Sequence, residues 1–186
     1  MKKLLAALLM LMAVCAACHR DGSEAAVPRR YAYPRVEPLD TATVACALGG
    51  VEARVSASAR FDMAASERPG WLTAAYPALG ATLYLSAART PDTGAALANR
   101  RERISLNLGG TPARTDRFDT AAGYAVELVT CSDGGVTTPV QFVAVGEGTV
   151  VSGAFVLHGT LAPADSLRPV VDALAAEAFR IAASLR

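Results

Sequence analysis

The sequence predicts an α+β fold, in which a mainly antiparallel sheet is covered by a mid-chain helix and a C-terminal amphipathic helix. Short apolar segments separated by glycine-rich or proline-containing turns recur along the chain, which is typical of strands. A threonine–proline pair precedes a helical stretch in the middle of the chain. Near the C-terminal end, apolar residues recur at helical spacing. Together these patterns favour strands, one helix, more strands and a final helix.

The strands are expected where apolar residues are bounded by turn residues. The expected strands are Thr43–Cys46, Val51–Ser56, Trp71–Tyr76, Gly80–Ala87, Gly123–Thr130, Pro139–Val145 and Thr149–His158. Leu83 and Leu85 alternate with polar neighbours, which is the period of two expected for a half-buried strand. Residues 132–135 and 146–148 have the composition of hairpin loops, so the last three strands should form a meander.

Two helices complete the predicted domain. Thr90 is expected to cap the first, with Pro91 in its first turn, and the helix over 92–104 should turn Leu97 and Ile104 inward. The second should begin near Asp165 or Ser166. One face of it carries Leu167, Val170, Val171, Leu174, Ala178, Ile181, Ala182 and Leu185. The order of a long helix, a three-strand meander and a terminal helix resembles the PsbP-like fold, which speaks to architecture alone.

The first residues have the pattern of a bacterial lipoprotein export signal. Lys2 and Lys3 precede an apolar run of fourteen residues, 4–17, and small residues stand just before Cys18. A transmembrane anchor is the alternative, but it needs roughly 20 apolar residues. We therefore expect residues 1–17 to be removed and Cys18 to be acylated. The acyl chains would hold the protein on a membrane outside the cytoplasm.

Residues 18–40 are expected to form an extended tether between the lipid and a single domain over residues 41–186. Pro28, Pro34 and Pro38 disfavour helix in this segment. The residues after Cys18 lack an acidic run, which favours an outer-membrane protein that faces the periplasm.

Charge gives little reason to expect a nucleic-acid partner. The processed chain has 16 arginines, no lysine and 17 acidic residues, a net charge of −1. A nucleic-acid-binding domain needs a larger basic face than this chain offers. The cluster Arg100, Arg101 and Arg103 is interpreted as the solvated side of the first helix.

Two cysteines, Cys46 and Cys131, remain besides Cys18 after processing. An oxidising compartment allows them to form a disulfide. Such a bond would close a long loop and add about 4 to 5 kcal/mol in the loop-entropy model. The alternative is two separate thiols that behave as small hydrophobic side chains. The sequence leaves both readings open.

No motif in the sequence carries recognisable chemistry. The two histidines, His19 and His158, have no metal-ligand spacing, and the glycine-rich stretches lack the lysine of a phosphate loop. Ser152 lacks the glycine two residues before it that a nucleophile elbow requires. We therefore expect no catalytic residue, no metal and no cofactor.

Four blocks of the sequence resemble the gliding-motility lipoprotein GldD family of Bacteroidetes. They are the lipoprotein signal with the tether Pro28–Pro38, the aromatic segment Trp71–Leu85, the segment Thr138–Phe142, and Gly153–Phe155 with Asp165–Val171. They follow the family's order over most of the processed chain, whereas residues 104–122 match poorly. No single block is diagnostic, and the ordered set carries the resemblance.

The resemblance implies a non-enzymatic envelope lipoprotein that supports the assembly or stability of the gliding and type IX secretion apparatus. Its partners would be other lipoproteins of that apparatus, and Cys18 is the one functional residue carried over. Aromatic and arginine side chains are enriched at interaction hot spots. The predicted contact surface therefore comprises Tyr33, Arg35, Trp71, Tyr76 and Pro77. The alternative function is the binding of a small hydrophobic ligand or lipid between the sheet and a helix.

Overall fold

The computed structural model describes residue 36 and residues 39–62, 68–159 and 164–186. Within these ranges the helices are α2 (Thr93–Leu108) and α3 (Ala164–Ala183), and Pro77–Leu79 form a short 3-10 turn, η1. The strands are β1 (Thr43–Leu48), β2 (Val51–Ser56), β3 (Arg60–Phe61), β4 (Trp71–Tyr76), β5 (Ala81–Arg89), β6 (Arg114–Asp119), β7 (Ala125–Thr130), β8 (Val140–Gly146) and β9 (Thr149–Leu157).

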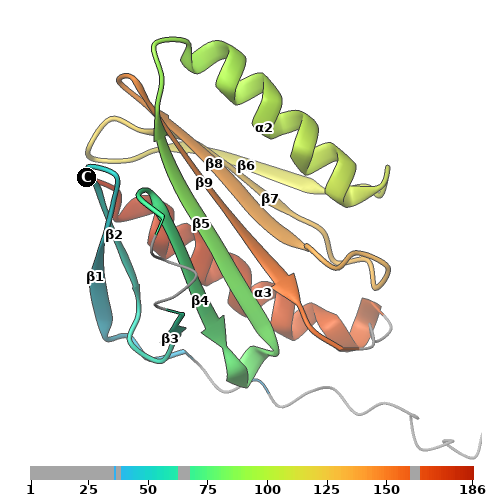
Figure 1. The fold of residues 1–186 in the computed structure, drawn as a ribbon. Coiled ribbons are helices and arrows are strands. Elements are labelled where there is room, and N and C mark those ends of the chain that lie inside the picture. Colours follow the sequence, from blue (N-terminus) through green and yellow to red (C-terminus); the bar gives the residue numbers. More distant parts are fainter. Residues whose placement is uncertain (1–35, 37–38, 63–67, 160–163) are drawn as a thin grey trace, which may run out of the picture. The chain divides into compact units, whose positions relative to one another are not determined.

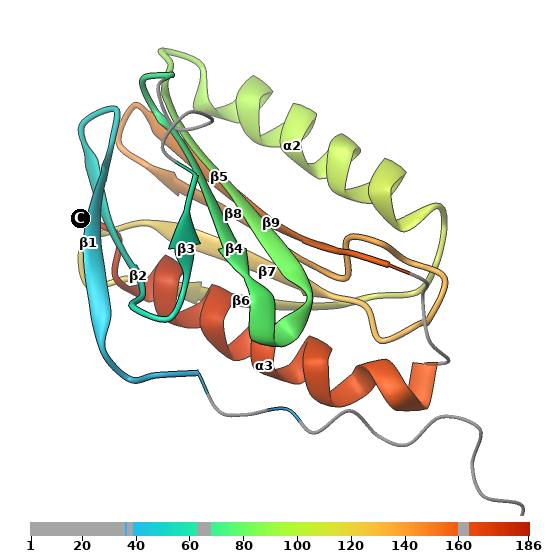
Figure 2. The same cartoon turned by 60° about the horizontal axis from the view of Figure 1, so that its bottom comes forward.

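The strands form two antiparallel sheets. The larger has the order β3-β4-β5-β9-β8-β7-β6, and the smaller pairs β1 with β2. Helix α2 lies on one face of the larger sheet and α3 on the other, as Figures 1 and 2 show from two sides. The predicted α+β class, with its mid-chain and C-terminal helices, is confirmed.

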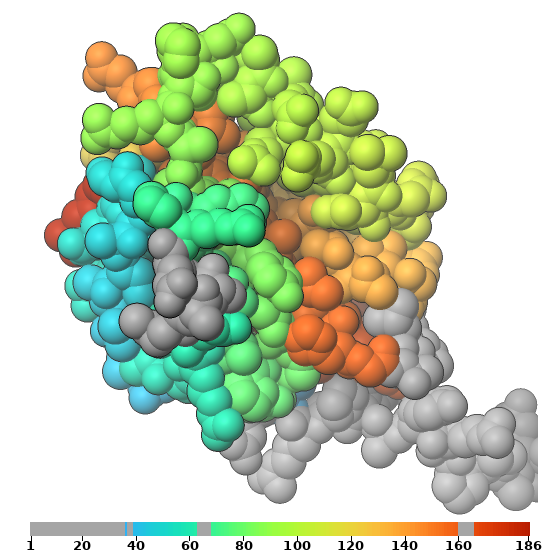
Figure 3. All heavy atoms as spheres, in the orientation of Figure 1, coloured from blue at the N-terminus to red at the C-terminus, as the bar shows by residue number. Residues whose placement is uncertain are grey.

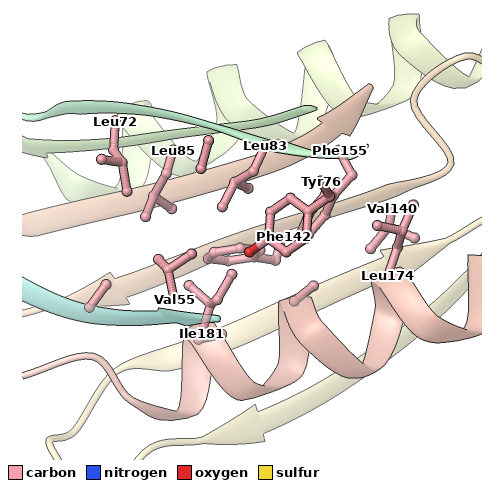
Figure 4. Close-up of a cluster of buried hydrophobic side chains, with 14 of the residues drawn as sticks. Val55, Leu72, Tyr76, Leu83, Leu85, Val140, Phe142, Phe155, Leu174 and Ile181 are labelled. Carbon is pink, nitrogen blue, oxygen red and sulfur yellow. The ribbon is translucent and has the colours of Figure 1, made fainter. Parts of the chain in front are cut away.

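The main core lies between the larger sheet and α3. Phe142, Phe155, Leu83 and Leu174 are at most 1% exposed and pack in one cluster, part of which is drawn in Figure 4. The predicted apolar face of α3 is confirmed, since all of its members are buried except the partly buried Leu167. Beyond α3, the backbone N–H groups of Glu52 and Arg186 donate to each other's carbonyl oxygens at 2.8 and 3.1 Å, which ties the end of the chain to β2.

One buried carboxylate joins α3 to both sheets. Glu177 is 1% exposed, and its Oε1 accepts hydrogen bonds from the Ser56 backbone N–H at 3.0 Å and from the Tyr76 hydroxyl at 2.7 Å. Its Oε2 accepts a hydrogen bond from Arg180, one turn further along α3. Burial, followed by the Glu177 charge, raises the pKa of Tyr76, so the phenol stays protonated and donates.

The chain reverses where glycine permits it. Gly49 and Gly50 both have positive φ, 55° and 95°, and connect β1 to β2 in a two-residue turn. Gly146 pairs with Thr149 across the two-residue turn between β8 and β9, so the hairpin loop predicted there is confirmed.

Helix α2 begins later than the sequence predicts. Its N-cap is Asp92, whose side chain accepts from the Ala95 N–H at 2.8 Å. The predicted cap Thr90 is wrong, because its hydroxyl instead accepts from the N–H of Asp92 itself, at 3.2 Å, before the helix begins.

Two strands were not predicted. The short β3 has two residues, and four of the six residues of β6 are charged, Arg114, Asp116, Arg117 and Asp119. Both are edge strands with one neighbour, so most of their side chains can remain in water. Phe118 is the residue of β6 that packs toward the core, and its ring centre lies 4.7 Å from that of Phe179 on α3.

Candidate ligand groove beneath helix α2

Helix α2 rests on the sheet without burying any of its own residues. Its sheet-facing apolar residues, Leu97 and Ile104, are half-buried. The strands below supply Val143 and Val150, which are buried on the face opposite to the main core. Helix α2 is therefore attached through a narrow apolar strip, which leaves space on both sides of it.

Polar contacts hold α2 in place on either side of this strip. Arg101 binds the Glu127 carboxylate of β7 through two hydrogen bonds, at 2.6 and 2.8 Å, and Arg117 of β6 adds a third at 2.9 Å. These arginines lower the pKa of Glu127 to about 2, so the carboxylate is charged at neutral pH. On the other side, the Asn107 amide donates to Gln141 Oε1 at 2.7 Å.

On the side of α2 where Asn107 binds Gln141, the helix and the sheet enclose a hollow of about 190 Å3, which we call the α2 groove. Figure 3 shows a recess there, between the atoms of α2 and those of β4 and β5. The groove is lined by Trp71, Tyr84, Ser86, Arg100, Arg103, Ile104, Asn107, Gln141, Phe142, Ser152, Gly153 and Ala154.

Small side chains make the floor of the groove. Ser86 lies opposite Ser152 in the β5–β9 register, and their hydroxyls are 3.0 Å apart. Ala154 lies opposite Tyr84 in the same pair of strands. A helix packed closely on a sheet would need larger apolar residues at these positions to fill the space beneath it.

Two aromatic side chains flank the floor. Trp71 is 45% exposed and Tyr84 is 42% exposed, and both belong to the sheet face that carries α2. Trp71 pairs with Ser86 and Thr73 pairs with Tyr84, so the two aromatic residues are diagonal neighbours on adjacent strands. Large exposed aromatic residues beside a hollow supply flat apolar surface for a ligand.

Two arginines border the groove from the helix. Arg100 and Arg103 are one turn apart on α2, and neither has an ion-pair partner within the described ranges 39–62, 68–159 and 166–186. Burial, followed by the charge of Arg103, lowers the pKa of Arg100. A guanidinium nevertheless keeps its charge in a protein, so the two positive charges stand side by side.

Two further hollows are less suited to a ligand. One, of about 270 Å3, lies on the other side of α2. Arg101 and Arg117, which line it, already form ion pairs with Glu127. The other, of about 330 Å3, lies against α3 beside Glu177 and Arg180, which also bind each other. The arginines that line these two hollows are therefore already bound by glutamates of the protein.

The predicted contact surface is only partly present in the described structure. Trp71 lies at the α2 groove, and Pro77 is exposed in η1. The contact role predicted for Tyr76 is wrong, because its side chain is 1% exposed and its hydroxyl is bound to Glu177. Tyr33 and Arg35 lie outside the described residues, as does the predicted lipidation site Cys18.

The two remaining cysteines belong to different parts of the fold. Cys46 is in β1 and half-buried, whereas Cys131 follows β7 and is buried, and both are free thiols. Burial raises the pKa of Cys46, which favours the neutral thiol.

The described residues contain no group of three or more His, Cys, Asp or Glu side chains that could hold a metal ion. Among the helices in the same ranges, none is both long and apolar enough to cross a membrane.

Of the residues that line the groove, only Trp71 belongs to the predicted contact surface. Arg100, Arg103, Ile104 and Asn107 recur at the spacing of one helical face, which was the available signal for a shared surface. The interpretation of this cluster as a solvated face holds for the exposed Arg101 and Arg103 but not for Arg100, which is half-buried.

No protein-family model matches the chain, and the search of curated proteins finds no match either. The resemblance to the gliding-motility lipoproteins therefore stays a prediction.

Proposed function

We propose that this protein is a non-enzymatic, lipid-anchored envelope protein that holds a small ligand between α2 and the sheet. The observation that carries the ligand-binding role is the α2 groove, where Trp71 and Tyr84 stay exposed above a floor of small residues. Ligand pockets combine apolar and aromatic walls with a few polar groups that fix orientation. The export signal and Cys18 support the membrane anchor.

A second candidate is an accessory role in the gliding and type IX secretion apparatus. It is supported by the sequence blocks that resemble the family, and by the exposure of Trp71 and Pro77 from the predicted contact surface. In this case the exposed aromatic residues would contact another envelope protein rather than a small ligand.

In-cell photocrosslinking distinguishes the two roles. Tyr84 is replaced by p-benzoylphenylalanine, cells are irradiated, and the intact mass of the recovered protein is measured. The ligand role predicts an adduct with the mass of a small molecule. The same replacement at Val44 is the control, because Val44 is similarly exposed (43%) but lies in the other sheet.

A protein-sized adduct at position 84 that contains type IX or gliding lipoproteins would support the second role instead. Equal adducts at positions 84 and 44 would contradict both roles for the groove. The intact mass of the recovered protein tests the anchor in the same cells, since a chain that begins at Cys18 should carry the mass of its acyl chains; an unmodified Cys18 would contradict lipidation there.

A further inference from the structure

We propose that the ligand of the α2 groove is a small organic anion with a flat ring, whose charged group binds Arg100 and Arg103 and whose ring packs on Trp71 and Tyr84. This inference rests on the proposed ligand-binding function and adds the charge and shape of the ligand.

The charge follows from the unpaired arginines. Of the three arginines in α2, Arg101 is bound by Glu127, whereas Arg100 and Arg103 both line the groove without a carboxylate partner in the described part of the chain. Like charges one helical turn apart repel each other. A carboxylate or phosphate between them would remove this repulsion and accept paired N–H groups from the guanidinium forks.

The flat ring follows from the aromatic walls and the size of the hollow. Trp71 and Tyr84 expose nearly half of their surfaces on one sheet face. The hollow measures about 190 Å3. For comparison, a cavity of about 150 Å3 in another protein accommodates benzene. A single ring therefore fits in the groove, with its charged substituent toward α2.

The floor adds a polar contact. Of the two hydroxyls that face each other at 3.0 Å, Ser86 and Ser152, one donates to the other. The second hydroxyl then has a hydrogen without a partner in that pair. A ring substituent that accepts a hydrogen bond would be held there, which would fix the orientation of the ligand.

The chain contains one tryptophan, Trp71, so its fluorescence reports on the groove directly. We would titrate the full-length lipoprotein with 4-nitrobenzoate and with 4-nitrobenzamide, a neutral molecule of nearly the same shape. Nitroaromatic rings quench tryptophan on contact, and lifetime measurements separate bound from collisional quenching. The expected result is binding of the benzoate at least about ten-fold tighter than the amide.

Three variants make the test specific. Arg100→Gln together with Arg103→Gln should abolish the preference for the benzoate. Arg114→Gln together with Arg168→Gln is the matched control, because both arginines are exposed and neither lines the groove. Ala154→Phe should abolish binding of both molecules by filling the floor. Circular dichroism checks that each variant is folded.

The outcomes distinguish failure of the anionic-ligand proposal from failure of the groove as a binding site. Equal binding of both molecules, unchanged in the Arg100→Gln, Arg103→Gln protein, would overturn the anionic ligand while the groove remained a binding site. Quenching that is collisional only, or unchanged by Ala154→Phe, would overturn the groove itself and with it the proposed function.

Discussion

Replacing Glu177 by alanine should lower the free energy of unfolding by about 3 kcal/mol, near the lower end of what removing one partner of a buried ion pair costs. The Ser56 N–H and the Tyr76 hydroxyl would both lose their acceptor inside the core. Arg180, whose side chain is 35% exposed, can turn toward water, which limits the loss. Urea denaturation of the folded variant measures the difference.

Two further variants serve as comparisons for Glu177→Ala. Glu177→Gln keeps one acceptor oxygen for the Ser56 N–H and the Tyr76 hydroxyl, but its NH2 group cannot accept from Arg180, and we expect a cost of about 1 to 2 kcal/mol. Glu102→Ala removes an exposed glutamate from α2 and should change stability by less than about 0.5 kcal/mol. A loss at Glu177→Ala no larger than that at Glu102→Ala would show that the buried carboxylate does not hold α3 to the sheets.

Replacing Gly153 by alanine should also destabilise the fold, by about 3 kcal/mol, the upper part of the range for overpacking. A Cβ at this position would lie 2.2 Å from Cε1 and 2.6 Å from Cζ of Phe142. Phe142 is 1% exposed and enclosed by the core, so its ring cannot move aside without displacing other side chains. The midpoint of thermal or urea unfolding measures this effect.

A double-mutant cycle identifies the cause. Phe142→Leu should recover part of the stability lost in Gly153→Ala, because it removes the ring that the new methyl group meets. Gly135→Ala is the matched control: its Cβ would have no neighbour nearer than 3.8 Å, and we expect little change. Additive effects of Gly153→Ala and Phe142→Leu would rule out the steric explanation.

Where burial follows a regular period, the fold could be predicted from the sequence. The apolar positions of α3 recur from Val170 to Leu185 with helical spacing, and the strand over Trp71–Tyr76 was predicted at its observed bounds. The edge strand β6 could not be predicted in this way. Its residues Arg114, Asp116 and Asp119 can stay solvated with one strand neighbour, which removes the apolar alternation that marks an inner strand.

The groove depends on contacts between residues far apart in the chain, which sequence patterns do not show. Trp71, Tyr84 and Arg100 come from β4, β5 and α2, and the space between them exists because Ser152 and Ala154 of β9 are small. The burial of Tyr76 likewise depends on Glu177, 101 residues further along the chain. An aromatic residue before a proline looks the same in sequence whether its hydroxyl meets water or a buried carboxylate.

Native mass spectrometry of the protein purified from its own cells tests most directly whether the α2 groove holds a small ligand. Wild-type protein should carry a second mass above that of the chain itself. Ala154→Phe should lose it, because the new ring fills the groove floor. Ala45→Phe, the same change at an exposed strand position of β1, should keep it. Wild-type protein that is empty in repeated preparations, or an unchanged second mass in Ala154→Phe, would contradict ligand binding in the groove.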